Sequence, residues 1–270
     1  MGAQFLLRKN VHRNFGGQAF EGDVAPYVIL TGSKERVTRI IQNWEISRLV
    51  ADHYEFLLYS GKYAGIPISV CSTGIGGTPV SIAVEELAFL GGQTFLRIGV
   101  TQPLASELKF GELVIAKGAV RWDGASMDYV RPEFPALAHF EVVMAAIAAA
   151  EQLHLPYKVG IIGDMASLGS RSMEGYRRFQ TERTKEMRQA MIRAGIIDGT
   201  GESAVMFVQA SIYGLRAGTI HLNARNERLH TWDMSEEDNL IKVGLETIRI
   251  LADWDHLKLQ RGIKFITPEF

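Results

Sequence analysis

Cysteine, net charge and long apolar runs are all scarce in this sequence, and each scarcity excludes a class of protein. Its 270 residues include one cysteine, Cys71, so an intramolecular disulfide and a zinc site built from several thiolates are excluded. A single cysteine fits a reducing compartment, and we expect the cytoplasm. The formal net charge of −1 gives no electrostatic reason to expect nucleic acid or a membrane as a partner. No apolar run has the length of a membrane span, so we expect a soluble protein with small-molecule ligands.

The short motifs of several large enzyme classes are missing as well. Residues 74–77, Gly-Ile-Gly-Gly, match neither the dinucleotide-binding glycine motif nor a phosphate loop ending in Gly-Lys-Ser/Thr. The seven histidines show no repeated ligand spacing, and no serine lies in a Gly-x-Ser-x-Gly turn. We therefore expect no nucleotide cofactor, no metal site and no covalent serine catalysis.

Short apolar runs alternate with helical patterns along the whole chain. No proline- or serine-rich linker, low-complexity tract or internal repeat divides it, which favours one domain over residues 1–270. Runs typical of buried strands occupy residues 24–32, 54–65, 66–74, 94–100, 112–120, 157–163 and 215–222. Helical periodicity covers residues 34–44, 78–92, 140–154, 173–195, 202–214 and 238–262. The second and third runs predict a hairpin, so we expect an α/β fold with a central mixed β-sheet flanked by helices.

Glycines crowd the segment Val-Cys-Ser-Thr-Gly-Ile-Gly-Gly at residues 70–77. Its apolar half is typical of a buried strand end, and its glycines lack the Cβ atoms that would keep another group away from the backbone. A helix is predicted directly after it, with Thr78 or Ser81 as the cap. The segment is either a cradle for an anion or a tight turn without a ligand, and it favours neither by itself.

Ligands of open α/β sheets collect beyond the carboxyl ends of the strands. In this chain those ends are followed by loops at residues 32–36, 73–78, 99–104, 163–176 and 223–227.

Charged residues near these strand ends are candidates for chemistry. Arg97 lies inside an apolar run, where a buried guanidinium needs either an anion such as phosphate or an ion pair with Glu85 or Glu86. The same two explanations apply to Arg36. Glu202 opens an apolar helix after a glycine-rich turn, where it is either an ordinary first-turn acid or an acceptor for ribose hydroxyls.

Two long blocks of the sequence carry a family resemblance. Residues 70–103, which contain Thr-Phe-Leu-Arg-Ile-Gly-Val, and residues 111–126, Gly-Glu-Leu-Val-Ile-Ala-Lys-Gly-Ala-Val-Arg-Trp-Asp-Gly-Ala-Ser, closely resemble the bacterial uridine phosphorylase branch of the nucleoside phosphorylase I superfamily. Shorter matches occupy residues 29–37, 132–141, 201–207 and 214–218. The resemblance leaves outside it an amino-terminal segment, residues 1–22, and a tail, residues 256–270.

Such enzymes cleave the N-glycosidic bond of a nucleoside with inorganic phosphate, which yields ribose 1-phosphate and the free base. The resemblance implies the same reaction here, with phosphate as co-substrate and no cofactor. It also implies a homo-oligomer, at least a dimer and up to a hexamer, because the family's sites are completed by a neighbouring subunit.

The resemblance assigns roles to individual residues. Arg97 and Glu202 would be catalytic. Phosphate would be bound by Gly32, Arg36, Arg97 and Thr101. Ribose would be bound by Thr200, Glu202 and His12, the histidine coming from a neighbouring subunit. The base would be bound by Met173 and Arg225.

Several functional positions depart from the family pattern. The branch's Arg-Ile-Gly-Thr-Thr-Gly reads Arg-Ile-Gly-Val-Thr-Gln here, so Val100 replaces a threonine whose hydroxyl binds phosphate. An arginine that the neighbouring subunit donates to phosphate falls on Tyr54. Because one unpaired buried phosphate oxygen costs about 1–3 kcal/mol, we expect weaker phosphate binding. On the ribose side Thr200 replaces one acid of the branch's Glu-Met-Glu-Ser, while Glu202 is retained.

The base-binding positions also differ. The branch binds uracil with Gln and Arg from a Gly-Gln-Glu-Arg-Tyr run, and here Met173 and Gly175 occupy those two positions and cannot make the same hydrogen bonds. In the next loop, a shift of one or two residues decides whether Arg225 replaces the missing arginine.

Three functions are therefore considered. The first is a phosphorylase of a non-standard nucleoside, whose lost contacts would be rebuilt by Arg171, Arg177, Arg178 or Arg225. The second is a nucleosidase that places water where phosphate would bind, although both retained phosphate-site arginines argue against it. The third is a catalytically weakened nucleoside-binding protein, which we rank last because the loss of motifs is partial. We expect phosphorolysis, with the base undefined by the sequence.

Overall fold

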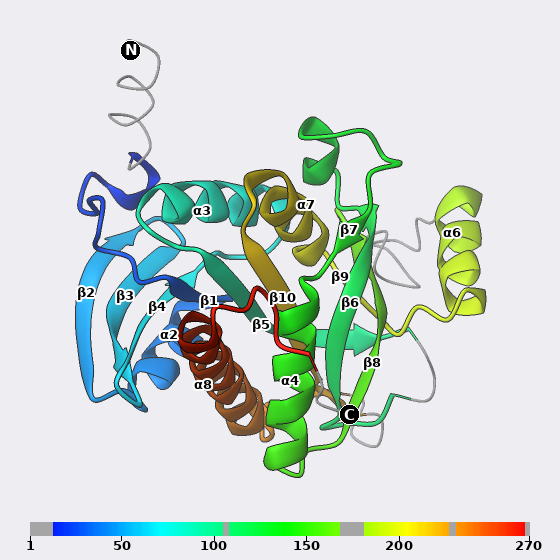
Figure 1. Cartoon of the computed structure of the whole chain (residues 1–270). Coiled ribbons are helices and arrows are strands. Elements are labelled where there is room, and N and C mark those ends of the chain that lie inside the picture. Colours follow the sequence, from blue (N-terminus) through cyan, green and yellow to red (C-terminus); the bar gives the residue numbers. More distant parts are fainter. Residues whose placement is uncertain (1–12, 105–107, 168–180, 227–230, 268–270) are drawn as a thin grey trace.

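The chain folds into a central β-sheet with helices on both of its faces (Figure 1). The structure is a computed structural model and describes residues 13–104, 108–167, 181–226 and 231–267. The strands are β1 (Tyr27–Thr31), β2 (Ile46–His53), β3 (Phe56–Tyr63), β4 (Ile66–Ser72), β5 (Thr94–Pro103), β6 (Leu113–Trp122), β7 (Ala136–Leu137), β8 (Tyr157–Met165), β9 (Asp198–Thr200), β10 (Arg216–Asn223), β11 (Arg225–Asn226) and β12 (Thr231–Trp232). The α-helices are α2 (Lys34–Ile41), α3 (Gly77–Phe89), α4 (Phe140–Gln152), α6 (Glu182–Arg193), α7 (Ser203–Tyr213) and α8 (Glu237–Arg261), and short 3-10 helices are η1 (Arg13–Phe15) and η2 (Ala125–Asp128).

Strand β5 is the centre of the sheet. It pairs in parallel with β1 on one side and with β10 on the other, and its last residues pair antiparallel with β9. Strands β10, β6, β8, β9 and β5 are hydrogen-bonded in a closed ring, and β1, β4, β3 and β2 extend the sheet from β5. The sheet is mixed, as expected, and the parallel strands β1, β5 and β10 bring their carboxyl ends to one edge.

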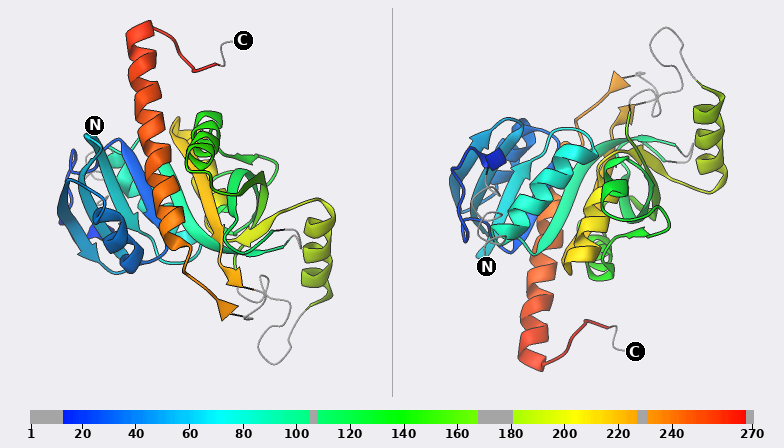
Figure 2. Two further views of the ribbon diagram at one scale, coloured as in Figure 1. Left: turned by 90° about the horizontal axis from the view of Figure 1, so that it is seen from below. Right: turned by 90° about the horizontal axis from the view of Figure 1, so that it is seen from above.

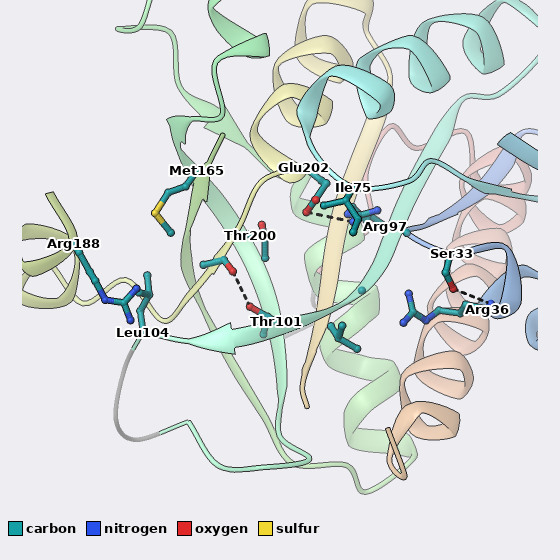
Figure 3. A pocket seen from close by; sticks show the side chains of 14 residues that line it. Ser33, Arg36, Ile75, Arg97, Thr101, Leu104, Met165, Arg188, Thr200 and Glu202 are labelled. Atoms are coloured by element: carbon teal, nitrogen blue, oxygen red, sulfur yellow. Dashed lines mark hydrogen bonds and ion pairs between the residues drawn. The ribbon is translucent and has the colours of Figure 1, made fainter. Parts of the chain in front are cut away.

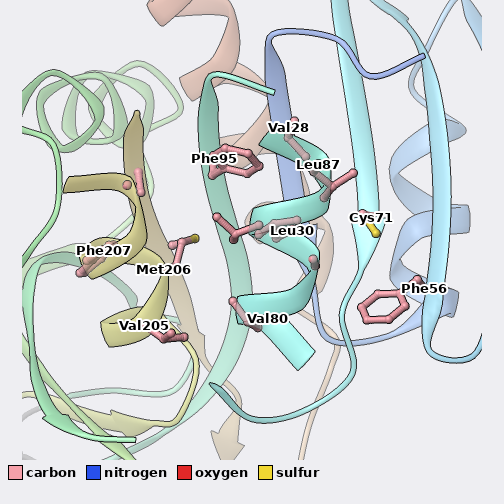
Figure 4. Packing of buried hydrophobic residues seen from close by; sticks show 14 of the residues in the cluster. Val28, Leu30, Phe56, Cys71, Val80, Leu87, Phe95, Val205, Met206 and Phe207 are labelled. Carbon is pink, nitrogen blue, oxygen red and sulfur yellow. The ribbon is translucent and has the colours of Figure 1, made fainter. Parts of the chain in front are cut away.

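The two faces of the sheet have separate hydrophobic cores. Along β1, Val28 and Leu30 pack with α3 and α7, whereas Ile29 packs on the opposite face with α2, α4 and α8. Figure 4 shows the first of these cores, with Phe95 of β5 between the two helices. Because side chains alternate along a strand, Arg97 extends from the same face of β5 as Phe95, toward the ends of α3 and α7.

Helix α6 lies far from β2, the strand at the antiparallel edge of the sheet. Figure 2 shows α6 at the opposite end from β2, while α8 extends beyond the sheet. None of the helices in the described part of the chain has the length and apolarity needed to cross a membrane.

The predicted strands all form, and the hairpin of β3 and β4 is confirmed. The predicted second strand began too early, because Tyr54 lies in the turn between β2 and β3 with a φ of 51°. Strand β2 was missed, since its first four residues are exposed and show no apolar alternation. Helix α3 begins at Gly77 without a side-chain cap, so the expected cap at Thr78 or Ser81 was wrong. Helix α6 is shorter than the predicted helix over residues 173–195, part of which lies outside the described residues.

Candidate active site

A cavity of about 360 Å³ opens at the carboxyl ends of β1 and β5, beside the first turns of α2, α3 and α7 (Figure 3). Its lining comes from four of the five loops predicted from strand ends, and in addition from β5, α6, β9 and the residue before α7. The lining residues are Gly32, Ser33, Arg36, Ile75, Arg97, Gly99, Val100, Thr101, Leu104, Met165, Arg188, Gly199, Thr200 and Glu202.

Arg97 is a buried cation in the wall of this cavity, with 5% of its surface exposed. Its Nη2 lies 3.3 Å from Oε2 of Glu202, and its Nη1 donates to the Thr73 hydroxyl at 3.5 Å. Its Nε has no hydrogen-bond partner among the described residues. A buried guanidinium that lines a cavity is a candidate partner for an anion in that cavity.

The ion-pair partners considered from the sequence for Arg97 were wrong. Glu85 accepts hydrogen bonds from Tyr129 and Tyr213, and Glu86 accepts from Asn14. The carboxylate that pairs with Arg97 is Glu202, which lies far from it in the sequence.

The glycine-rich turn after β4 holds the Glu202 carboxylate. Glu202 Oε1 accepts the backbone N–H of Gly76 at 2.8 Å, and Oε2 accepts the N–H of Gly201 at 3.1 Å. Gly74 and Gly76 have φ angles of 68° and 104°, which other residues rarely adopt. The turn therefore donates a backbone N–H to a carboxylate of this chain. It differs from both alternatives considered from the sequence, a cradle for a bound anion and a tight turn without a ligand.

Arg36 combines both explanations that its sequence position allowed. It lines the cavity, and its Nε donates to Oε1 of Glu237 at 2.7 Å while Nη1 donates to the Thr31 hydroxyl at 2.8 Å. Burial, and then the positive charge of Arg97, lower the pKa of Arg36 to about 10. Arg36 is thus a second cation on the same side of the cavity, held in place by the first turn of α8.

Two glycines keep the space around the Arg97 guanidinium open. A Cβ atom on Gly32 would lie 3.8 Å from Nη2 of Arg97, and a Cβ atom on Gly99 would lie 3.9 Å from the same nitrogen. A side chain at either glycine position would occupy the space in front of the Arg97 guanidinium. This end of the cavity, lined by Arg36 and Arg97, is called the anion end below.

Buried Asp164 supports the part of the cavity wall that contains Thr200. It is fully buried on β8 and accepts hydrogen bonds from the Thr200 hydroxyl and from the backbone N–H of Ala204 in the first turn of α7. Burial, with a smaller contribution from nearby Glu202, raises the pKa of Asp164 to about 6. Asp164 thereby fixes Thr200 and the start of the helix that follows Glu202.

Six predicted site residues meet in this cavity, namely Gly32, Arg36, Arg97, Thr101, Thr200 and Glu202. The hydroxyl of Thr101 donates to the carbonyl of Gly199 at 3.2 Å. Arg225 lies on β11 and is not among the described residues that line the cavity. His12 and Met173 lie outside the described residues.

Sequence reasoning missed Arg188 of α6 as a lining residue. Leu104 and Met165 lie within predicted loops but were not singled out, and they line the same end of the cavity as Arg188 (Figure 3). An arginine in a charged helical stretch resembles a solvated helix face, so no local signal marked it.

Metal ligands and reactive thiols are not grouped at this site. Within the described ranges, no cluster of three or more His, Cys, Asp or Glu residues could hold a metal ion. Burial raises the pKa of the Cys71 thiol, so Cys71 is a buried apolar side chain in the first core.

The fold and the cavity define an α/β protein whose ligand site contains a buried cation and carboxylate at the ends of parallel strands. A family model described as the phosphorylase superfamily matches residues 26–250. The chain belongs to this superfamily, in its uridine phosphorylase branch, which confirms the resemblance found in the sequence.

Relatives of known name cover most of the chain. It is 41% identical over 252 residues to a uridine phosphorylase of Thermococcus kodakarensis, covering 92% of this chain and 90% of the relative. It is 34% identical over 201 residues to a guanosine phosphorylase of Halorubrum lacusprofundi, covering 74% and 78%. The crystal structure of a uridine phosphorylase from Vibrio fischeri matches with a TM-score of 0.76 at 28% identity, covering 86% of this chain and 95% of that one.

The raised pKa of Asp164 predicts a pH-dependent stability difference between the protein and its Asp164→Asn variant. Because the pKa is about 6 in the folded protein against an ordinary value of 3.8, ionised Asp164 costs stability above pH 6, and this cost disappears as the pH falls toward 3.8. We expect the variant to gain on the order of 2 kcal/mol relative to the unchanged protein between about pH 4.5 and about pH 7.5. Denaturant unfolding at both pH values measures the difference.

The matched control is Asp128→Asn, since Asp128 is exposed. Its stability difference from the unchanged protein should be the same at both pH values. An equally constant difference for Asp164→Asn would show that Asp164 does not have a raised pKa.

Proposed function

We propose that this protein is a nucleoside phosphorylase, which cleaves the N-glycosidic bond with inorganic phosphate and releases ribose 1-phosphate and the free base. The observation that carries the proposal is the buried Arg97 guanidinium, which lines the cavity together with Arg36 and lies 3.3 Å from the Glu202 carboxylate. This arrangement supports a site for an anion at Arg97 and an acceptor for sugar hydroxyls at Glu202, next to it.

Phosphate binds at the anion end in this proposal. Its oxygens accept hydrogen bonds from Arg97 and Arg36, in the space that Gly32 leaves open. As the glycosidic bond stretches, the sugar acquires oxocarbenium character, and a dianion beneath the anomeric carbon stabilises that positive charge. The same anion is the nucleophile, so binding and positioning provide most of the catalysis.

Ribose binds next to the phosphate, through the carboxylate of Glu202. Carboxylate oxygens accept several hydrogen bonds at once, and the N–H groups of Gly76 and Gly201 hold these oxygens in place. The hydroxyl pair of a ribose matches such an acceptor. Thr200, held by Asp164, lies on the same wall.

Hydrolysis is the second candidate for this site. A hydrolase orients a neutral water, for which two buried guanidinium groups in one wall offer no advantage. The retained Arg36 and Arg97 therefore favour phosphorolysis. Because the named relatives include a uridine phosphorylase and a guanosine phosphorylase, uridine and guanosine are the first substrates to examine.

A homo-oligomer in the cytoplasm, either a dimer or a hexamer of three dimers, forms part of the same proposal. Strand β2 supports it, because Ile46 and Leu49 on this strand and Tyr54 after it are exposed apolar or aromatic side chains. Light scattering of the purified protein measures the assembly, and a monomer would contradict this part.

Release of free base from nucleosides, with and without inorganic phosphate, tests the proposed reaction. Uridine, cytidine, guanosine, inosine and adenosine form the panel, and the sugar product is identified in each case. We expect base release only with phosphate, together with ribose 1-phosphate. Equal release without phosphate would show a hydrolase, and no release from any nucleoside would favour a binding protein.

Restoring the missing hydroxyl at residue 100 should strengthen phosphate binding. Val100 lines the cavity, and Val100→Thr has nearly the same shape but adds a hydrogen-bond donor. One added hydrogen bond to a charged phosphate oxygen is worth about 1.5–3 kcal/mol, so the KM for phosphate should fall by roughly tenfold or more while the KM for nucleoside changes little. The control is Val159→Thr, because Val159 is exposed and outside the cavity lining. An unchanged phosphate KM in Val100→Thr would place the phosphate elsewhere.

A further inference from the structure

The cavity has two chemically different ends. Arg36 and Arg97 form the anion end, and the other end is lined by Leu104, Met165 and Arg188 (Figure 3). In Figure 3 Glu202, which pairs with Arg97, lies between these ends. Leu104, Met165 and Arg188 are called the distal end below.

Packing holds Arg188 at the distal end. Met191, one turn further along α6, is buried in a small core with Leu104, Met165 and Ile196. This core fixes the inward face of α6, so Arg188 on the preceding turn faces the cavity. Partial burial lowers the pKa of Arg188, in keeping with a guanidinium that lies against apolar side chains.

We propose that Arg188 donates a hydrogen bond to the carbonyl oxygen at C4 of a pyrimidine or C6 of a purine and thereby selects bases with an oxo group at that position over their amino counterparts. This inference rests on the proposed function, because it places the base at the distal end once phosphate and ribose occupy the anion end and Glu202. Uridine is then preferred to cytidine, or inosine and guanosine to adenosine.

The order of groups along the cavity favours a base at the distal end. Phosphate and base lie on opposite faces of the anomeric carbon during displacement, so the base extends away from the anion end. Leu104 offers a branched alkyl group and Met165 an apolar thioether, and both pack well against a flat ring.

A second phosphate group is a poorer occupant of the distal end. Phosphate sites combine several cations or backbone N–H groups. Arg188 is the only cation that lines the distal end within the described part of the chain, and its lining neighbours there are apolar. One guanidinium beside apolar side chains suits a neutral ring with a carbonyl oxygen better.

The selectivity follows from hydrogen-bond chemistry. A guanidinium has donors and no acceptor, so it binds an oxo group and leaves an exocyclic amino group without a partner. A site built to bond one polar group discriminates strongly against an analogue that cannot make that bond.

Affinity for free bases tests the inference independently of turnover. Calorimetric titrations of uracil, cytosine, hypoxanthine and adenine would compare the unchanged protein with Arg188→Met, which keeps an apolar stem but removes every donor. We expect the oxo base of at least one pair to bind roughly 10- to 100-fold more tightly than its amino counterpart. Arg188→Met should remove most of that preference and leave the affinity for inorganic phosphate unchanged.

Two further variants separate this role from a structural one. Arg188→Lys, which keeps the charge without the planar fork, should restore part of the preference. Arg193→Met, at an exposed position of the same helix outside the cavity lining, should leave it intact. The preference should also appear in kcat/KM for the nucleosides, mainly through KM.

The results separate the role of Arg188 from the proposed phosphorolysis. A preference that survives in Arg188→Met, or no preference for either oxo base in the unchanged protein, would overturn the role of Arg188. Oxo preference that depends on Arg188, in a protein that cleaves no nucleoside, would support the inference and reject the proposed function. Turnover with phosphate but without a preference for oxo bases would support the proposed function and reject the role of Arg188.

Discussion

The ion pair between Arg97 and Glu202 is the interaction on which the site depends. Both side chains are nearly completely buried, and burying two charges is costly unless each has good partners. Glu202 accepts hydrogen bonds from the N–H groups of Gly76 and Gly201, whereas Nε of Arg97 has no hydrogen-bond partner among the described residues. The pair is therefore more completely satisfied on its carboxylate side than on its cation side, which is the arrangement expected where an anion binds beside it.

Strand β5, the turn before α3 and Asp164 together position the two members of this ion pair. Alternation along β5 directs Arg97 to the face covered by α3 and α7, and the positive φ angles of the turn before α3 bring a backbone donor to Glu202. Asp164 supports the chain on either side of Glu202, because it accepts hydrogen bonds from the Thr200 hydroxyl and from the backbone N–H of Ala204 in the first turn of α7. These supports lie on strands and at helix ends, and α6 adds a lining residue from the edge of the molecule.

The sequence predicted the part of the site that follows from local pattern. Apolar runs located the strands, and the rule that ligands collect at their carboxyl ends located Arg36, Arg97 and the loop of Met165. The partner of Arg97 could not be predicted, because it depends on how α3 and α7 pack together on one face of the sheet. Arg188 was not predicted either, since its helix has a polar sequence and its orientation is set by a small core around Met191.

A test of the central interaction is the coupling between anion and nucleoside binding. If an anion competes with Glu202 for the Arg97 guanidinium, the carboxylate becomes a better acceptor for ribose hydroxyls, and the two ligands bind with positive cooperativity. The measurement is the dissociation constant of uridine or guanosine by calorimetry with and without saturating sulfate, an unreactive analogue of phosphate. We predict at least about fivefold tighter nucleoside binding with sulfate. An unchanged or weaker affinity would contradict a shared role for Arg97 and Glu202.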